Sequence, residues 1–141
     1  MTQNTALLLP MLGMIFLTFG IMIWMLKLRY QAIRKDGLNP RYFELYRGAK
    51  IPDYLAKVTQ HYENLLEMPP MFYAAIILLI TLKIVDPFYV FLAWSFFLLR
   101  LLHSYIHTTN NTLKKRKNAF IASTLVLMIL WIRVLISIIN M

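Results

Sequence analysis

The chain contains no cysteine among its 141 residues. This absence excludes disulfide bonds, thiolate metal sites and a cysteine nucleophile, so any thiol chemistry requires a thiol carried by a ligand. Acidic side chains are also scarce, with six Asp and Glu against fifteen Lys and Arg and a formal net charge of +9. The basic residues flank apolar segments instead of forming one patch, and no nucleic-acid recognition motif is present. The charge therefore indicates membrane topology and not nucleic-acid binding.

Apolar residues make up 60% of the chain and form four long runs, at about residues 6–26, 66–85, 88–110 and 118–139. A helix needs about 20 residues to cross roughly 30 Å of hydrocarbon, so each run is long enough or nearly so. The first run has no basic leader and no small-residue cleavage pattern, which predicts a retained helix and not a signal peptide. The sequence therefore predicts one all-α integral membrane domain over residues 1–141, a four-transmembrane-helix bundle whose second helix covers about 62–85.

Lys and Arg predict the orientation of this bundle. The polar segment of residues 27–58, which we expect to be a loop with at most a short helix, contains eight of them. The turn before the last apolar run contains four more, Lys114, Lys115, Arg116 and Lys117. Because Lys and Arg in loops stay in the cytoplasm, both basic segments are predicted to be cytoplasmic and both termini to face the other side.

Two of the apolar helices carry polar groups that lipid disfavours. Asn64 and Glu67 lie on one helical stripe, and Arg100, His103 and His107 lie on another. At about 1.5 Å per residue from the Asp86-Pro87 turn, Glu67 lies at about 28 Å, between His103 at about 24 Å and His107 at about 30 Å. Ionisable groups at membrane depth are functional-site candidates. We therefore predict a Glu67–Arg100 or Glu67–His103 pair, with Asn64 in the same cluster.

Three alternatives stay open at this point. The buried pair either fixes the register of two helices or lines a cavity. Pro69-Pro70 either begins the membrane part of the second helix or bends it beside Glu67. His103 and His107, four residues apart, have a spacing that can bind a metal with Glu67, although the only further candidate ligand is His61.

The pattern of these polar residues resembles the MAPEG family, the membrane-associated proteins in eicosanoid and glutathione metabolism. Asn-x-x-Glu-x-x-Pro at Asn64, Glu67 and Pro70 is followed by Arg-x-x-His at Arg100 and His103, and then by an arginine at the start of the last helix. The resemblance covers roughly residues 58–135, and the four-crossing topology extends it to the whole chain. The stretches around these motifs are most similar to the small bacterial members, which implies an inner-membrane protein.

The resemblance implies a homotrimer with sites between protomers, where glutathione is activated for addition to lipophilic electrophiles or for peroxide reduction. It implies that Asn64, Glu67, Arg100, His103 and His107 contribute to a glutathione-like ligand site. Arg116 would be the catalytic cation that stabilises the thiolate.

Three positions depart from the pattern of the family enzymes. Gln60 replaces an arginine, His107 replaces a tyrosine and Phe120 replaces an aromatic hydroxyl, so part of the glutathione cradle is missing. Two functions therefore stay open. The chain is either a glutathione-dependent transferase or peroxidase, or a non-catalytic protein of the same fold. In the second case it binds lipid or quinone or serves as a subunit of a larger membrane complex.

Overall fold

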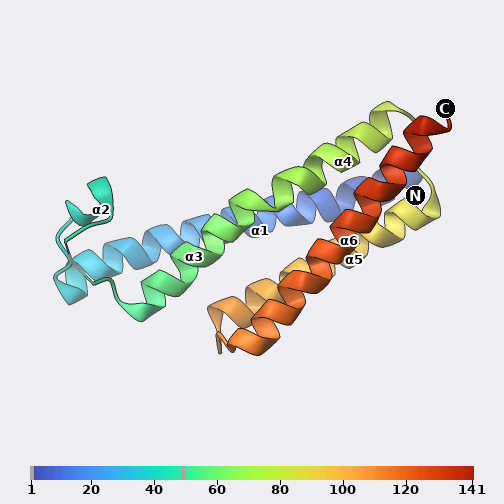
Figure 1. Ribbon diagram of the computed structural model, residues 1–141. Coiled ribbons are helices and arrows are strands. Elements are labelled where there is room, and N and C mark those ends of the chain that lie inside the picture. The colour runs from blue at the N-terminus through green and yellow to red at the C-terminus, as the bar shows by residue number, and fades with distance from the viewer. Residues whose placement is uncertain (1, 49) are drawn as a thin grey trace.

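The protein is described by a computed structural model that covers residues 2–48 and 50–141. The helices of the described residues are α1 (Gln3–Asp36), α2 (Tyr42–Leu45), α3 (Asp53–Glu67), α4 (Pro69–Thr81), α5 (Pro87–Thr108) and α6 (Leu113–Ile139). Figure 1 shows α1 beside α3 and α4, and α5 antiparallel to α6, with both termini at the end where α4 connects to α5. The paired ends of α1 and α3, together with α2, project beyond the α5–α6 turn.

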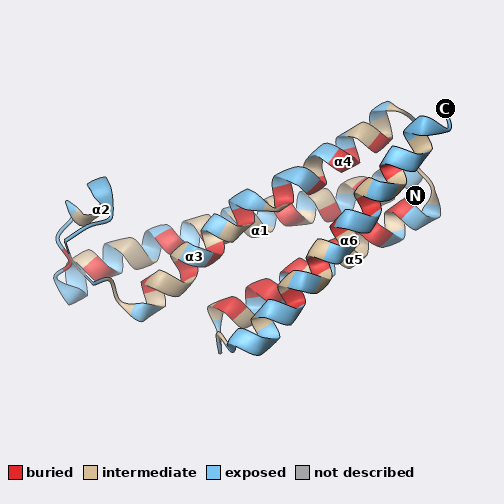
Figure 2. Ribbon diagram, viewed as in Figure 1, coloured by how far each residue is buried: buried red, intermediate tan, exposed pale blue. Residues whose placement is uncertain are grey.

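The described residues contain four helical segments that are long and apolar enough to cross a membrane, if α3 and α4 are counted as one segment. Large apolar side chains are exposed along their outer faces, as the alternating colours of Figure 2 show, and they include Phe16, Phe91, Leu125 and Ile132. An apolar surface of this kind is suited to lipid. The chain is therefore an integral membrane protein that contacts lipid, and the predicted all-α membrane fold is confirmed.

The predicted loop of residues 27–58 is too long, because the structure makes both of its ends helical. Residues 27–36 continue α1 until Gly37, which adopts a left-handed conformation (φ 67°) and ends the helix. Residues 53–58 form the first turns of α3. Polarity limits where a helix lies in the bilayer and not whether it forms. At about 1.5 Å per residue, the 34 residues of α1 extend about 51 Å, well beyond the hydrocarbon. Ala49, within the predicted loop, lies outside the described residues.

The second membrane segment is broken at Met68, where α3 ends and α4 begins. Pro69 and Pro70 occupy the first positions of α4. Proline has no N–H to donate to the preceding turn, so it is tolerated at the start of a helix and interrupts one that already exists. The last carbonyls of α3 consequently have no donors within their own helix. The break adjoins Glu67, the last residue of α3.

The start of α5 is fixed by Asp86. Its carboxylate accepts the backbone N–H groups of Phe88 and Tyr89 at 2.9 and 3.1 Å, which makes it an N-cap. The same carboxylate pairs with Arg133 of α6, whose Nη1 lies 2.8 Å from Oδ1. The hydrogen bond from Arg133 holds the pKa of Asp86 below its ordinary value. This pair joins the α4–α5 connection to the far end of α6.

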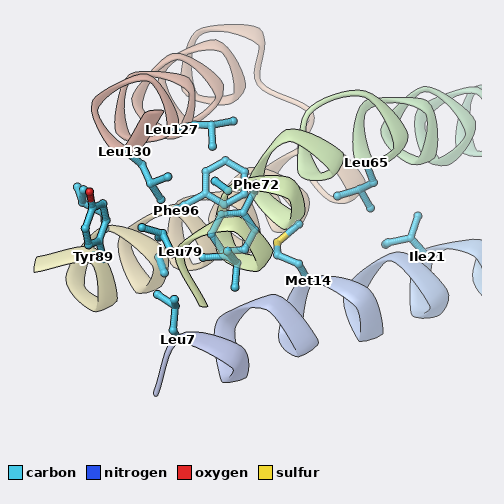
Figure 3. Packing of buried hydrophobic residues seen from close by; sticks show 14 of the residues in the cluster. Leu7, Met14, Ile21, Leu65, Phe72, Leu79, Tyr89, Phe96, Leu127 and Leu130 are labelled. Atoms are coloured by element: carbon cyan, nitrogen blue, oxygen red, sulfur yellow. The ribbon is translucent and has the colours of Figure 1, made fainter. Parts of the chain in front are cut away.

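The core contains apolar side chains from every long helix. Figure 3 shows Phe72 of α4 and Phe96 of α5 facing one another, with Met14 of α1 and Leu127 of α6 nearby. The two phenylalanine rings are stacked, with centroids 4.5 Å apart and an interplanar angle of 28°. Because lipid tails are as apolar as these side chains, close packing and not transfer from water holds the helices together.

Gly13 permits α1 to approach α5 closely. A Cβ at this position would lie 2.7 Å from Cζ of Phe97, whereas a Cβ at Gly20 would have nothing within 4 Å. Gly13→Ala should therefore lower the free energy of unfolding by about 1–3 kcal/mol, because the ring must move. Gly20→Ala should leave it unchanged or slightly higher, because alanine has the higher helix propensity. Denaturation of both variants in one detergent measures the difference, and equal effects would mean that Phe97 moves aside freely.

Candidate functional site

A cavity of about 370 Å³ lies between α3, α5 and α6, at the end of the bundle opposite the termini. Its lining residues are Gln60, Glu63, Asn64 and Glu67 of α3, His103 and His107 of α5, and Leu113, Arg116, Lys117 and Phe120 of α6. Five of the six predicted site residues, namely Asn64, Glu67, His103, His107 and Arg116, thus come together around one hollow. The sixth, Arg100, does not line it.

The wall contributed by α3 follows from helical spacing. Positions 60, 63, 64 and 67 are separated by three and four residues, so their side chains lie on one face. The side-chain amide of Asn64 donates to the backbone carbonyl of Gln60 at 2.9 Å, which ties it to its own helix. Glu63 and Glu67 are exposed and make no ion pair with any described residue. This wall therefore presents two free carboxylates and two neutral amides.

The opposite wall is basic, and the turn before α6 orients its principal cation. Asn111 has a left-handed conformation (φ 48°), and its N–H donates to the Ile106 carbonyl at 2.8 Å, which closes the end of α5. Its side-chain oxygen accepts a hydrogen bond from Nη1 of Arg116 at 2.7 Å. The same Nη1 lies 3.4 Å from Nε2 of His107. Arg116 is therefore held in the wall of the cavity, beside a histidine of the neighbouring helix.

Arg100 is fully buried behind the cavity and does not form the predicted pair with Glu67. Within the described residues neither Glu67–Arg100 nor Glu67–His103 is an ion pair. The Nη2 group of Arg100 instead donates to the backbone carbonyl of Asn64 at 3.0 Å. The physical reason is the helix break: Asn64 is one of the last four residues of α3, whose carbonyls need donors from outside the helix. Arg100 supplies one, and Glu67 is left facing the cavity.

Three histidines form a buried cluster beside the cavity. The ring centroids of His61, His103 and His107 are 5.1–5.6 Å apart, and each side chain is at most 2% exposed. Nε2 of His61 lies 2.7 Å from Oγ of Ser104, so a hydrogen bond joins α3 to α5. The described residues contain no group of three His, Asp or Glu side chains that could hold a metal ion. The metal alternative that the histidine spacing left open therefore has no support from the geometry.

A comparison with protein families identifies the family of the chain. The family model described as "MAPEG family" matches residues 7–136, which is nearly the whole chain. The chain belongs to the MAPEG family. No curated protein and no solved structure matches it significantly. Membership of this family is consistent with a membrane bundle of four helices. The chemistry of the cavity depends on the residues that line it.

Three polar residues in or beside the cavity of this MAPEG protein were not predicted as ligand-site residues from the sequence: Glu63, Asn111 and His61. Glu63 could have been found, because it lies three residues after Gln60 and four before Glu67 on the same stripe. Asn111 could not, because its contact with Arg116 depends on the conformation of a turn. His61 had been considered only as a metal ligand, and its hydrogen bond with Ser104 depends on how α3 and α5 pack.

Proposed function

We propose that the protein is a MAPEG enzyme that binds a glutathione-like thiol in the cavity and transfers it to a lipophilic electrophile, or uses it to reduce a lipophilic peroxide. The observation that carries this proposal is the position of Arg116, which is fixed by Asn111 in the wall of a cavity that Leu113 and Phe120 also line. We further propose that the protein is a homotrimer in a bacterial inner membrane, with the cavity toward the cytoplasm and both termini on the other side.

The donor set suits such a ligand. Arg116 and Lys117 are available for acidic groups, and Glu63 and Glu67 are available for an ammonium group. Bound glutathione would supply the thiol that the chain itself lacks. The guanidinium of Arg116 stabilises negative charge at its end of the cavity, which favours a thiolate over a thiol. Phe120 and Leu113 contribute apolar surface, which suits a lipophilic second substrate.

Calorimetry of the detergent-purified protein with glutathione tests this proposal. We expect measurable binding heat, and we expect Arg116→Ala to weaken binding about tenfold or more, because a charge-assisted hydrogen bond contributes about 1.5–3 kcal/mol. Glu67→Gln should also weaken binding if this carboxylate holds the ammonium group. Lys115→Ala is the matched control, since Lys115 is in the same helical turn and does not line the cavity.

Absence of binding at millimolar glutathione would contradict the proposal. The remaining function would then be the non-catalytic one, in which the same bundle binds lipid or quinone or forms part of a larger membrane complex. The proposal would also be contradicted if Arg116→Ala and Lys115→Ala weakened glutathione binding equally. The basic segment would then act only through its net charge.

A further inference from the structure

The charged side chains that line the cavity are separated by sign between two helices. Both of its carboxylates, Glu63 and Glu67, are on α3, and both of its cations, Arg116 and Lys117, are on α6. Lys57, three residues before Gln60, does not line this cavity; it lines an adjoining hollow together with Asp53, Gln60 and Asn111. Within the described residues the cavity is therefore acidic on one wall and basic on the other.

These charges do not neutralise one another. The described residues contain one ion pair, Arg133–Asp86. It lies at the α4–α5 connection, at the opposite end of the bundle from the cavity. The guanidinium of Arg116 is engaged by the neutral oxygen of Asn111 and not by a carboxylate. Glu63, Glu67 and Lys117 are exposed. The two walls thus present complementary charges to whatever enters between them.

Two buried histidine nitrogens lie beside the cavity. Among the described residues, Nδ1 of His103 and Nδ1 of His107 have no hydrogen-bond partner, and both side chains are only 2% exposed. Each of these atoms has less than 1 Å² of accessible surface, so neither faces the open cavity. The charged side chains of the two walls are therefore the groups that meet a ligand first.

From this charge order we infer that the ligand is a zwitterion with an ammonium group that has no carboxylate beside it. Its ammonium group faces Glu63 and Glu67, and its acidic group faces Arg116 and Lys117. This inference rests on the proposed function and ranks its thiols: a thiol of net charge zero binds more tightly than glutathione. Glutathione carries a carboxylate on the same carbon as its ammonium group. That carboxylate would be brought against the acidic wall, where like charges weaken the binding of glutathione to the millimolar range without abolishing it.

The structure assigns this selectivity to Glu63 and Gln60. Glu63 supplies the second carboxylate of the acidic wall, and Gln60, three residues earlier, is neutral. An arginine at position 60 would place a cation on the same stripe, where it could pair with a carboxylate beside the ammonium group. The single substitution Gln60→Arg should therefore change the preference from a ligand with an isolated ammonium group to one with a carboxylate beside its ammonium group.

Calorimetry with three probes tests the inference on the detergent-purified full chain. Cysteinylglycine is a thiol with an isolated ammonium group and one carboxylate. γ-Glutamylcysteine is a thiol that carries a carboxylate beside its ammonium group and a second one elsewhere. Glycerophosphoethanolamine has the isolated ammonium group and a singly charged phosphodiester without a thiol, and it represents a lipid headgroup. We expect cysteinylglycine to bind at least tenfold more tightly than γ-glutamylcysteine.

Two variants and a control make the outcome specific. Glu63→Gln should reduce the ratio of the two dissociation constants toward one, and Gln60→Arg should reverse it. Lys115→Ala should leave it unchanged. Equal affinities in the unaltered protein, or tighter binding of γ-glutamylcysteine, would overturn the inference and leave the thiol-dependent function intact. Binding of glycerophosphoethanolamine without either thiol would support the charge order and overturn the thiol function. Binding of none of the three would overturn both.

Discussion

Replacing Phe72 with alanine should lower the free energy of unfolding by about 3 kcal/mol. Phe72 is fully buried and stacks on Phe96 of α5, with ring centroids 4.5 Å apart. Loss of a buried phenylalanine typically costs about 3–5 kcal/mol in soluble cores. We expect the lower end of this range, because the unfolded state in a detergent or lipid phase also surrounds the ring with apolar groups. The lost packing around the cavity left behind then accounts for most of the effect.

Phe16→Ala is the matched control for this prediction. Phe16 is a phenylalanine in the apolar part of α1, and it is 69% exposed on the outer face of the bundle. Its removal should change the free energy of unfolding by about 0.5 kcal/mol or less, since outward substitutions away from special contacts have small effects. Unfolding of both variants in mixed micelles, followed by circular dichroism, measures the difference. A loss for Phe72→Ala as small as that for Phe16→Ala would contradict the packing described for α4 and α5.

A loss of about 3–5 kcal/mol is also expected for Arg100→Ala. Arg100 is the largest of the fully buried side chains, and its removal leaves a cavity between α3, α5 and α6. It also removes the donor that the Asn64 carbonyl needs at the end of α3. An unsatisfied buried carbonyl contributes about 1–3 kcal/mol of this loss. The same denaturation experiment applies here.

Arg100→Met separates the two causes. Methionine refills much of the volume, and it removes the guanidinium atoms Nε and Nη1, for which the described part of the chain supplies no hydrogen-bond partner. Replacing a buried charge by an apolar side chain of similar size is often well tolerated. We therefore expect Arg100→Met to retain most of the stability and to lose only the contribution of the Asn64 contact. If Arg100→Met is as unstable as Arg100→Ala, the charge itself is stabilising, and Arg100 has a partner beyond the contacts described above.

The membrane helices could be predicted because the bilayer imposes a simple length and polarity requirement. The predicted Asp86-Pro87 turn lies where α5 begins, and Asp86 also proves to be its N-cap. Pro69-Pro70 had left two interpretations open, and the structure shows a helix break at Met68. The ends of α1 and α3 could not be predicted in the same way. Polarity marks where a helix leaves the hydrocarbon, and Gly37, not Lys27, is the residue at which the chain stops being helical.

The site could be predicted only as far as helical faces determine it. Spacing placed Asn64 and Glu67 on one stripe and His103 and His107 on another, and these residues do line one cavity. The partner of Arg100 was predicted wrongly, because depth along two helices says nothing of how a broken helix end presents its carbonyls. Charge attraction favoured Glu67, whereas the geometry of the break favoured the Asn64 backbone.

The separation between the chain termini and the cavity has a practical consequence. Both ends of the chain emerge beside the α4–α5 connection, and the cavity is beside the α5–α6 turn. A fluorescent or affinity tag at either end therefore stays a full helix length from the ligand. A reporter whose signal depends on its compartment should report the same side of the membrane whether it is fused to the amino or to the carboxyl end. Each fusion therefore serves as an independent check on the other.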